Sequence, residues 1–466
     1  MTGRTVTTDY LVVGAGAMGM AFTDALIDHA DVHVTLVDRN HSAGGHWLDA
    51  YPFVQLHQAS QFYGVASTVL GTGAVQQSGP EQGLSERARQ PEIESYFDDV
   101  LRRRFVGSGR VTFLGASNHH VDGDEQLVTS RVSGETVRID VRRRVVDATY
   151  LSPTIPATTP PPFPVADDVR VVAVNELADL SEVPQTFVIV GAGKTATDAI
   201  VWLLANGVSP DRVMWVRPRE PWMLNRAVVQ PDPLVAMGLT TSIMTAAAGA
   251  VTPDDLFRRL EADDVVMRVD PALTATMAKT PTLGAWELDL LRTIERVVRL
   301  GHIRQVTGAE IVLEQGRVAL PPDSLIVHCA ASGLSYPPMV PIWGRDRIRL
   351  QTSRTGFPCF NAALIGLVEA TRDDDRERNR LCPPNRLSDN PIDWIQMQVR
   401  GIGAARRFGA EPDIAAWANT CALNPARIDP SLGDSPAIRA AAEKVAERMA
   451  LGLPRLAELG RMPAPA

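Results

Sequence analysis

The sequence has few of the residues that mark disulfide-containing, metal-binding or nucleic-acid-binding proteins. Its four cysteines lie far apart and form no CxxC pair, which excludes a redox-active dithiol and gives no zinc-ligand spacing. Isolated cysteines are typical of the reducing cytoplasm, where they pack as small apolar groups. The net charge is −8, so the chain has no basic field suited to nucleic acid.

Long hydrophobic runs and targeting segments are also scarce. The apolar run Tyr10–Val13 is too short for a signal peptide and leads directly into glycines. The uncharged stretch Leu234–Val251 has about the length of a membrane span, but threonines, alanines and two glycines dilute it, so it predicts a buried helix. We therefore expect a soluble cytoplasmic protein, and 466 residues favour two domains with insertions.

The N-terminal region carries a dinucleotide-binding pattern. The run Tyr10–Val13 predicts a buried strand, Gly14–Gly19 reads GAGAMG, and a helical pattern follows. The next predicted strand, Val32–Val37, ends at Asp38. A GxGxxG motif between a strand and a helix, followed by an acid about 20 residues on, is the dinucleotide fingerprint.

Each residue of this fingerprint has a physical role. Gly14 permits the tight turn, Gly16 lets a pyrophosphate approach the backbone, and Gly19 lets the helix pack on the strand. The helix N-terminus faces the phosphates, and Asp38 would accept hydrogen bonds from the ribose hydroxyls. The alternative is a structural glycine turn in a βαβ unit that holds no nucleotide.

A second copy of the pattern lies far downstream. Phe187–Val190 predicts a strand, Gly191–Ala196 reads GAGKTA, and Thr195–Asn206 predicts a helix. Alanine takes the place of the third glycine, which the fingerprint allows. The following strand, Arg212–Val216, is not followed by an acid.

The residues after that strand are basic. Arg217 and Arg219 stand where an acid would favour NAD, and arginine there accommodates the 2′-phosphate of NADP. Lys194, one of only three lysines in the chain, falls in the phosphate loop and could add a point charge. These residues favour NADPH over NADH, and ordinary solvated arginines are the alternative.

The segment after the first acid completes a family resemblance. Gly44–Trp47 reads GGHW, and together with the first fingerprint it resembles the two-dinucleotide-binding-domain flavoproteins, especially the flavin-containing and Baeyer–Villiger monooxygenases. The resemblance implies that FAD binds the first Rossmann unit and NADPH the second. It implies FAD contacts at Gly14, Gly16, Gly19, Asp38, Arg39, His46 and Trp47. It implies NADPH contacts at Gly191, Gly193, Lys194, Thr195, Arg217 and Arg219.

The resemblance continues toward the C-terminus but has one departure. Ser324–Leu334 is similar to the strand and turn that return to the FAD domain, and Phe357–Gly366 is similar to the segment whose helix N-terminus lies against the flavin. The Phe-x-Gly-x-x-x-His linker of the monooxygenases is missing, and a proline-rich stretch, Thr149–Pro164, stands in its place. We therefore expect a divergent bacterial branch of this group.

The candidate catalytic residues lie between the two fingerprints. His57 and Gln58 occupy the place where the resemblance implies a polar side chain near the reactive edge of the flavin. A donor there could hydrogen-bond a flavin peroxide, while the cofactor supplies the redox chemistry. The alternative for His57 is a satisfied histidine packed beneath the ring.

The sequence predicts an α/β fold with two Rossmann-like domains, the second inserted in the first. The expected FAD domain comprises residues 1–160 and 322–466, and the expected NADPH domain comprises residues 165–321. A helical insertion at residues 226–300 would cover the cleft between them, where a small organic substrate reaches the flavin.

Three functions follow from these predictions. The first is an FAD-dependent monooxygenase that uses NADPH and molecular oxygen to oxygenate a small organic substrate. The second is an NADPH reductase or dehydrogenase without productive oxygen chemistry, which the missing linker favours. The third is a non-enzymatic FAD-bound regulatory protein. The intact second phosphate loop argues against it, because NADPH binding would then serve no purpose.

Overall fold

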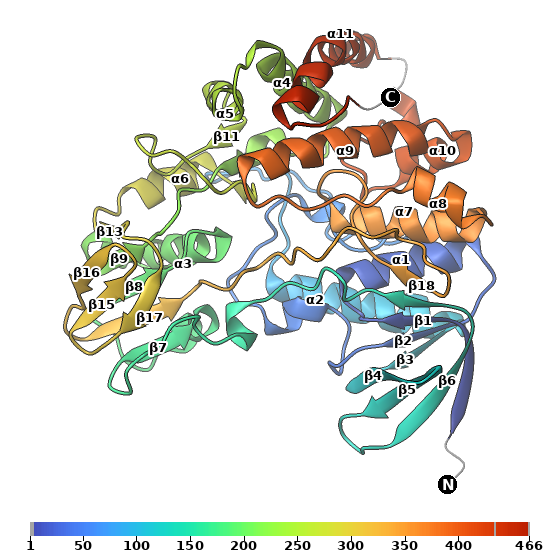
Figure 1. Ribbon diagram of the computed structural model, residues 1–466, viewed down its shortest axis with the longest axis horizontal. Helices are drawn as coiled ribbons and strands as arrows, with labels where there is room; N and C mark the ends of the chain where they lie inside the picture. Colours follow the sequence, from blue (N-terminus) through green and yellow to red (C-terminus); the bar gives the residue numbers. More distant parts are fainter. Residues whose placement is uncertain (1–3, 433–434, 465–466) are drawn as a thin grey trace.

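The computed structural model describes residues 4–432 and 435–464 and has two α/β units below a layer of helices (Figure 1). The predicted α/β fold with two Rossmann-like domains is confirmed, because each unit is built on a parallel sheet whose first strand leads through a glycine loop into a helix. The chain leaves the first unit, forms the second, and returns to the first.

The first unit contains a seven-stranded sheet in the order β3-β2-β1-β6-β5-β4, with β18 beside β6. The parallel strands are β1 (Thr5–Val13), β2 (Val34–Val37), β3 (Val111–Leu114), β6 (Thr136–Asp147) and β18 (Arg347–Arg349). The antiparallel strands are β4 (Ser117–Asp122) and β5 (Glu125–Ser130).

Two helices far apart in the sequence pack together on this sheet. They are α1 (Ala17–His29) and α7 (Pro358–Thr371). A Cβ at Gly366 would lie 2.6 Å from the carbonyl oxygen of Phe22, so only glycine permits this close approach of the helices. Helix α2 (Gln90–Asp99) also belongs to this unit (Figure 1).

The second unit contains a five-stranded parallel sheet in the order β13-β9-β8-β17-β7. Its strands are β7 (Arg170–Ala173), β8 (Thr186–Val190), β9 (Val213–Val216), β13 (Val297–Val298) and β17 (Ser324–His328). Helices α3 (Lys194–Ala205) and α6 (Ala285–Arg292) pack together beside it. A meander is appended, with strands β14 (Ile303–Val306), β15 (Glu310–Leu313) and β16 (Gly316–Ala319).

The second sheet corrects the predicted domain boundary. Strand β17 pairs with β8 on one side and with β7 on the other, and all five of its residues are buried. The boundary placed between residues 321 and 322 is therefore too early, because the strand interpreted as the return to the first unit completes the second sheet.

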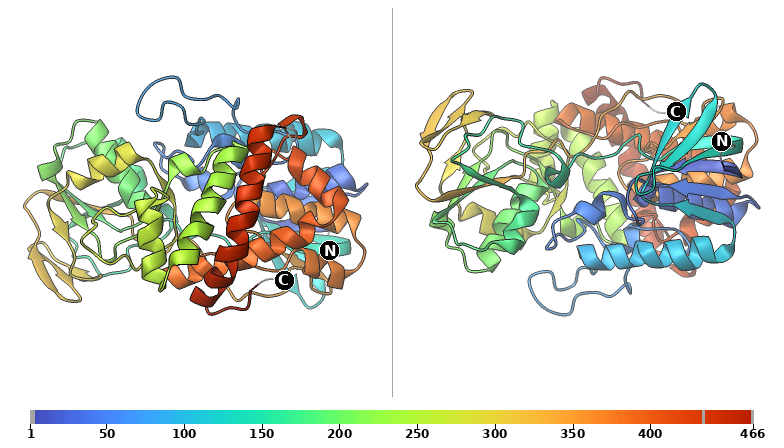
Figure 2. Two further views of the ribbon diagram at one scale, coloured as in Figure 1. Left: turned by 90° about the horizontal axis from the view of Figure 1, so that it is seen from above. Right: turned by 90° about the horizontal axis from the view of Figure 1, so that it is seen from below.

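The insertion is part of a helical layer shared with the C-terminal region. Helices α4 (Pro233–Gly249) and α5 (Pro253–Ala262) form one apolar cluster with α9 (Pro391–Gly409) and α11 (Pro436–Leu459). Figure 2 shows α11 lying across the insertion helices. The remaining helices and short strands are α8 (Asp375–Leu381), α10 (Pro412–Thr420), β10 (Met223–Asn225), β11 (Val266–Met267) and β12 (Thr282–Leu283).

Two predictions for the insertion need correction. Helix α4 forms as expected, but it is only half-buried, and Leu234 is 42% exposed because α5 and α11 cover one side only. The insertion was expected to be helical up to residue 300, but its last helix ends at Arg292, since Val297–Val298 pairs with β9 as a strand. Among the described residues, no helix has the length and apolar character needed to cross a bilayer.

Candidate cofactor and active site

The first glycine loop has the geometry that its fingerprint requires. Gly14 has a φ of +104°, in the region that disfavours side chains. A Cβ at Gly19 would lie 1.9 Å from the carbonyl oxygen of Gly14, so a side chain there would force the loop and helix α1 apart. The loop and helix are therefore built for glycine at both positions.

A second segment lies directly over this loop. The Gly44 amide donates to the carbonyl of Ala15 at 2.9 Å. A Cβ at Gly45 would lie 2.9 Å from Cα of Gly16, closer than real Cβ contacts. The Gly-Gly pair of the GGHW segment therefore covers the first phosphate loop, and no side chain separates the two.

Asp38 bonds to the loop itself. Its carboxylate accepts the amide of Ala15 at 2.6 Å and the amide of Asn40 at 2.8 Å. Burial raises the pKa of Asp38, against the opposing effect of these two hydrogen bonds. Each oxygen keeps further lone pairs, so a ribose hydroxyl could still donate to it. Arg39 is exposed, and its carbonyl accepts from Arg131 at 2.8 Å.

His46 and Trp47 follow the Gly-Gly pair inside the protein. The Trp47 indole donates to the Tyr63 hydroxyl at 2.6 Å, and the rings of His46 and Trp47 are 5.3 Å apart. Burial lowers the pKa of His46 to about 4, yet the side chain keeps accessible surface. His46 is therefore neutral in the folded protein.

The second glycine loop is open where the first is covered. Gly191 has a φ of +144°, and a Cβ there would lie 2.8 Å from the carbonyl oxygen of Cys329. A Cβ at Gly193 would meet no described atom within 4 Å. Free space beside the middle glycine is what a pyrophosphate on this loop needs. Thr195, in the first turn of α3, is half-buried.

Lys194 turns away from that space into a group of buried charges. We name the six residues the interdomain ion cluster, and each side chain is at most 12% exposed. The members are Glu81, Arg87, Lys194, Asp198, Arg226 and Glu287.

The cluster is continuous. Arg226 pairs with Glu287 at 2.7 Å and contacts Glu81, which pairs with Arg87 at 2.8 Å. The Lys194 ammonium contacts Asp198 and lies 3.8 Å from Glu287. Three cations and three acids balance, which is the condition under which buried charges are tolerated.

The cluster joins three parts of the chain around His57. Arg226 Nε donates to the His57 carbonyl at 3.1 Å, and the Thr282 hydroxyl contacts the same oxygen. From the first unit, the Tyr51 hydroxyl donates to Asp198 of α3 at 2.7 Å. The backbone of the candidate catalytic segment is thus fixed by the second unit and the insertion.

The electrostatics of this region keep His57 neutral. Burial, followed by Lys194, Arg226 and Arg87, lowers the pKa of His57 well below its usual range. Burial raises the pKa of Glu287, but Lys194 and Arg226 lower it more, to about 2. Glu287 is therefore a permanent carboxylate, and His57 can donate and accept a hydrogen bond without being an acid. Gln58 is half-buried next to it.

Sequence reasoning missed most of this cluster. Glu81 and Arg226 are 145 residues apart in the sequence, and Arg226 and Glu287 are 61 residues apart. No local sequence pattern therefore predicts these ion pairs. Lys194 was expected to face phosphates. In the structure its ammonium group contacts the carboxylates of Asp198 and Glu287. Contact with a phosphate would require the ion pair with Glu287 to open.

The arginines after β9 are also placed differently from each other. The Arg217 side chain is 1% exposed, lies 4.5 Å from the centre of the Trp215 ring, and pairs with Glu220 at 2.9 Å. Arg219 is 31% exposed and donates to the Thr276 carbonyl at 2.8 Å. Arg299, which follows the neighbouring strand β13, is 38% exposed and was not among the predicted residues.

Two aromatic residues pack in a cluster with Ala59, which directly follows Gln58. The rings of Phe62 and Phe357 are 5.2 Å apart, edge to face, within a small apolar cluster that includes Val229 of the insertion. Phe357 is the N-cap of α7 and has a φ of +50°, a conformation that is strained for a bulky residue. Strained residues of this kind gather at functional sites.

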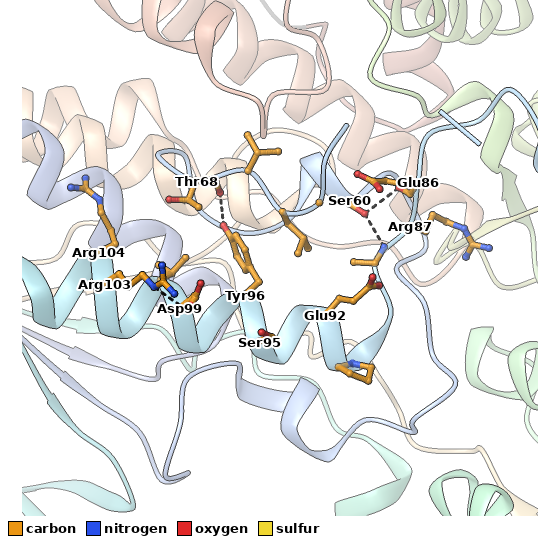
Figure 3. Close-up of a pocket in the computed structure, with 16 residues that line it drawn as sticks. Ser60, Thr68, Glu86, Arg87, Glu92, Ser95, Tyr96, Asp99, Arg103 and Arg104 are labelled. Atoms are coloured by element: carbon orange, nitrogen blue, oxygen red, sulfur yellow. Dashed lines mark hydrogen bonds and ion pairs between the residues drawn. The ribbon is translucent and has the colours of Figure 1, made fainter. Parts of the chain in front are cut away.

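A surface cavity of about 780 Å³ lies outside this region (Figure 3). It is bounded by α2 and by the loop around Thr68, whose carbonyl accepts from the Tyr96 hydroxyl at 2.6 Å. Arg87 is the one residue of the ion cluster on its wall, and no predicted cofactor or catalytic residue lines it. The cavity is therefore separate from the candidate site.

Two Rossmann units, the second inserted in the first, define the fold of the two-dinucleotide-binding-domain flavoproteins. A steroid monooxygenase solved with NADP has this fold with a TM-score of 0.51 and 15% identity, over 78% of this chain and 85% of that chain. A cyclohexanone monooxygenase in its closed form matches at a TM-score of 0.49 and 16% identity, over 95% of this chain and 98% of that chain.

Sequence relatives define the family more closely. Two uncharacterized proteins of Mycobacterium tuberculosis and one of Mycobacterium bovis are each 39% identical over 440 residues, which is 94% of this chain and 81% of each relative. The chain belongs to the family of these mycobacterial proteins. No family model matches the sequence.

Proposed function

We propose that the protein is an FAD-dependent, NADPH-using oxidoreductase, and within that class a monooxygenase acting on a small organic substrate. The observation that carries the proposal is the arrangement of the two glycine loops. One is covered by the chain's own Gly44–Gly45, the other is open beside Gly193, and the ion cluster joins the two units around His57. The steroid monooxygenase of the same fold was solved with NADP, which supports the assignment of the second loop.

The residues of the first loop fit FAD. Gly14, Gly16 and Gly19 leave a backbone cradle, Asp38 has lone pairs for a ribose, and neutral His46 follows the Gly-Gly pair that covers the loop. Arg39 and Trp47 complete the proposed contacts. Bound FAD would supply hydride acceptance and oxygen chemistry.

The residues of the second loop fit NADPH. Gly191 and Gly193 form the turn, Thr195 stands in the first turn of α3, and the helix N-terminus favours a phosphate. Arg219 is the accessible cation after β9, while Arg217 would have to leave Glu220 to reach a 2′-phosphate. We therefore give Arg219 the larger share of the preference for NADPH.

The chain itself would orient the reactants and exclude water. Neutral His57 and neighbouring Gln58 can each donate a hydrogen bond without changing charge. Phe62 and Phe357 form an apolar wall that suits an organic substrate and excludes water from the reacting centre.

The second candidate is a reductase or dehydrogenase that passes hydride to an acceptor. The missing linker signature between the two units favours it. A dithiol mechanism for this candidate is not supported. The four cysteines are buried and unpaired, and burial raises the pKa of Cys359 to about 12. The acceptor would therefore have to be another molecule.

Oxygen use separates the two candidates. The purified protein should contain FAD, be reduced by NADPH without oxygen, and then consume one oxygen molecule per NADPH. Replacing Gln58 with Leu removes a donor and keeps its bulk, so FAD binding and reduction should persist while more NADPH oxidation ends as hydrogen peroxide. Faster reduction of an added electron acceptor than of oxygen, by both proteins, supports the dehydrogenase instead.

Nucleotide preference tests the second loop. The Arg219→Ala variant should raise the Michaelis constant for NADPH roughly ten- to a hundredfold, because a charge-assisted bond contributes about 1.5–3 kcal/mol. The constant for NADH should change little. Arg217→Ala serves as the comparison, and a larger effect there would mean that the pair with Glu220 opens when nucleotide binds. Equal kinetics of the unaltered protein with both nucleotides would contradict the NADPH assignment.

A further inference from the structure

The accessible arginine that follows β9, Arg219, is paired with an acid from a distant part of the chain. The acid is Asp389, which lies two residues before α9. Its Oδ2 lies 3.4 Å from Nη1 of Arg219, and its Oδ1 lies 3.7 Å from Nζ of Lys279. Asp389 and Arg219 are 170 residues apart in the sequence, so only the folded chain brings them together.

The backbone around Asp389 is fixed by contacts that do not involve Arg219. The Ala278 amide donates to the Asp389 carbonyl at 2.7 Å, and the Ser388 hydroxyl donates to the Ala278 carbonyl at 2.6 Å. The Tyr336 hydroxyl donates to the Ser388 carbonyl at 3.0 Å. The position of Asp389 is therefore supported even when its carboxylate is neutralised.

The three charged side chains keep accessible surface and an excess of positive charge. Arg219, Lys279 and Asp389 are 31%, 24% and 33% exposed. Arg219 also donates to the Thr276 carbonyl and Lys279 to the Ser332 carbonyl, each at 2.8 Å. No other carboxylate of residues 4–432 or 435–464 forms an ion pair with either cation. Two positive charges thus share one negative charge, and the group can attract a further anion.

The charges at this strand end separate NAD from NADP. After the second strand of a Rossmann unit, an acid accepts from the ribose 2′-hydroxyl of NAD, whereas an arginine binds the 2′-phosphate of NADP. The residues that directly follow β9 include Arg217 and Arg219 and lack an acid until Glu220, which is held by Arg217. Asp389 supplies a carboxylate at Arg219, so a 2′-phosphate that approaches Arg219 meets a negative charge.

We propose that Asp389 is a specificity-determining residue of the nucleotide site, which competes with the 2′-phosphate for Arg219 and lowers the preference for NADPH over NADH. The proposal rests on the proposed function, in which Arg219 binds the 2′-phosphate. When NADPH enters, its phosphate replaces the carboxylate as the partner of Arg219. NADH carries a hydroxyl instead, which can donate to the carboxylate, so the acid weakens the binding of NADPH alone.

The test is equilibrium binding of NADP⁺ and NAD⁺ to the purified protein, measured by titration calorimetry. In Asp389→Asn the dissociation constant for NADP⁺ should fall roughly three- to tenfold, because accessible charges interact with modest strength. The constant for NAD⁺ should stay within about twofold, because the amide can still accept from a hydroxyl. Salt screens accessible charges, so the gain for NADP⁺ should shrink at roughly 0.5 M sodium chloride. Asp389→Ser removes the same charge and decides in its place if the asparagine variant unfolds.

A matched control removes a carboxylate elsewhere in the second unit. Glu310 pairs with the exposed Arg317 at 3.1 Å in the appended meander, so Glu310→Gln makes the same change in net charge. It should bind NADP⁺ like the unaltered protein, and an equal gain there would overturn the proposal, because net charge alone would explain it. Weaker NADP⁺ binding by Asp389→Asn would mean that the acid positions Arg219 for the phosphate. Unchanged binding would mean that the acid does not compete, and either result overturns the proposal.

Failure of the proposed function gives a different result. In that case the unaltered protein binds NADP⁺ no more tightly than NAD⁺, and Arg219→Ala changes neither constant. A preference for NADP⁺ that depends on Arg219, together with unchanged binding by Asp389→Asn, overturns only the role of Asp389.

Discussion

The two phosphate loops share a glycine pattern and differ in what surrounds them. A Cβ at Gly16 would lie 3.6 Å from Cα of Gly45, whereas a Cβ at Gly193 would meet no described atom within 4 Å. The acid of the first unit, Asp38, bonds to its own loop, whereas the basic residue of the second, Arg217, is held by Glu220. The first loop is covered by Gly45 and hydrogen-bonded to Asp38 of its own unit, and the second loop faces open space.

This difference matches two kinds of nucleotide binding. A ligand enclosed by its own loop and by a covering segment dissociates only when that segment moves. A ligand on an open loop can enter and leave in each cycle. We therefore propose that the covered loop holds a prosthetic group and that the open loop holds a nucleotide that exchanges.

The largest expected effect concerns Lys194, whose position distinguishes the two loops most clearly. Replacing Lys194 with Met leaves the carboxylates of Asp198 and Glu287 without one of their cations. Removing one partner of a buried pair costs about 3–5 kcal/mol, so urea unfolding should show a loss of that order. Lys444→Met, on the exposed face of α11, is the matched control and should have no measurable effect. Unchanged stability together with weaker NADPH binding would mean that Lys194 leaves the cluster to bind phosphate.

Substituting the middle glycine of each loop tests directly which nucleotide that loop binds. A Cβ is sterically tolerated by the protein at both Gly16 and Gly193, so Gly16→Ala and Gly193→Ala test the ligands and not the fold. Each substitution should weaken its own nucleotide about ten- to a hundredfold, since an overpacked contact costs roughly 1–3 kcal/mol. Both quantities are measured on both variants. The FAD content should fall in the Gly16 variant only, and the NADPH dissociation constant should rise in the Gly193 variant only. Loss of FAD in Gly193→Ala alone would reverse the assignment.

Acid should destabilise both regions through their neutral histidines. His46 lies beside the first loop and His57 beside the ion cluster, and both have folded pKa values below that of the unfolded chain. The unfolded state binds the extra protons, so this stability is present above about pH 6.5 and is lost as the pH falls toward 4. His46 should contribute about 2 kcal/mol of loss between pH 7 and pH 5, and His57 should add a loss in the same direction.

Variants assign this pH dependence to the two regions. His46→Phe and His57→Asn should each remove part of the slope of unfolding free energy against pH. His41→Asn, at an exposed position, is the control in which no buried histidine is removed. A slope unaffected in both buried variants would show that other groups cause the acid sensitivity.

Local patterns explain which features the sequence could predict. Each fingerprint is a strand, a glycine turn and a helix in one continuous stretch, so its elements and the close contact at Gly19 follow from spacing alone. The burial of Arg217 also had a local signal, because Glu220 lies three residues later. That signal was outweighed by the expectation of a phosphate ligand.

Contacts between distant segments could not be predicted in the same way. The ion cluster joins the first unit, helix α3 and the insertion, and each pair depends on the final arrangement of the domains. The end of the second domain was missed for a related reason, since only pairing with β7 and β8 shows that β17 belongs there. The covering of Gly16 by Gly45 likewise depends on how a loop folds back.

The long-range closure of the first unit has a consequence for synthesis on the ribosome. The Tyr10 hydroxyl donates to Glu369 at 2.7 Å across 359 residues, and α1 packs on α7. By contrast, the sheet of the second unit is complete once β17 has emerged. Domains usually form from the N-terminus onward, but here the N-terminal strands must wait for the last third of the chain. We therefore expect the second unit to become protease-resistant first during translation, and the first glycine loop to gain its final partners last.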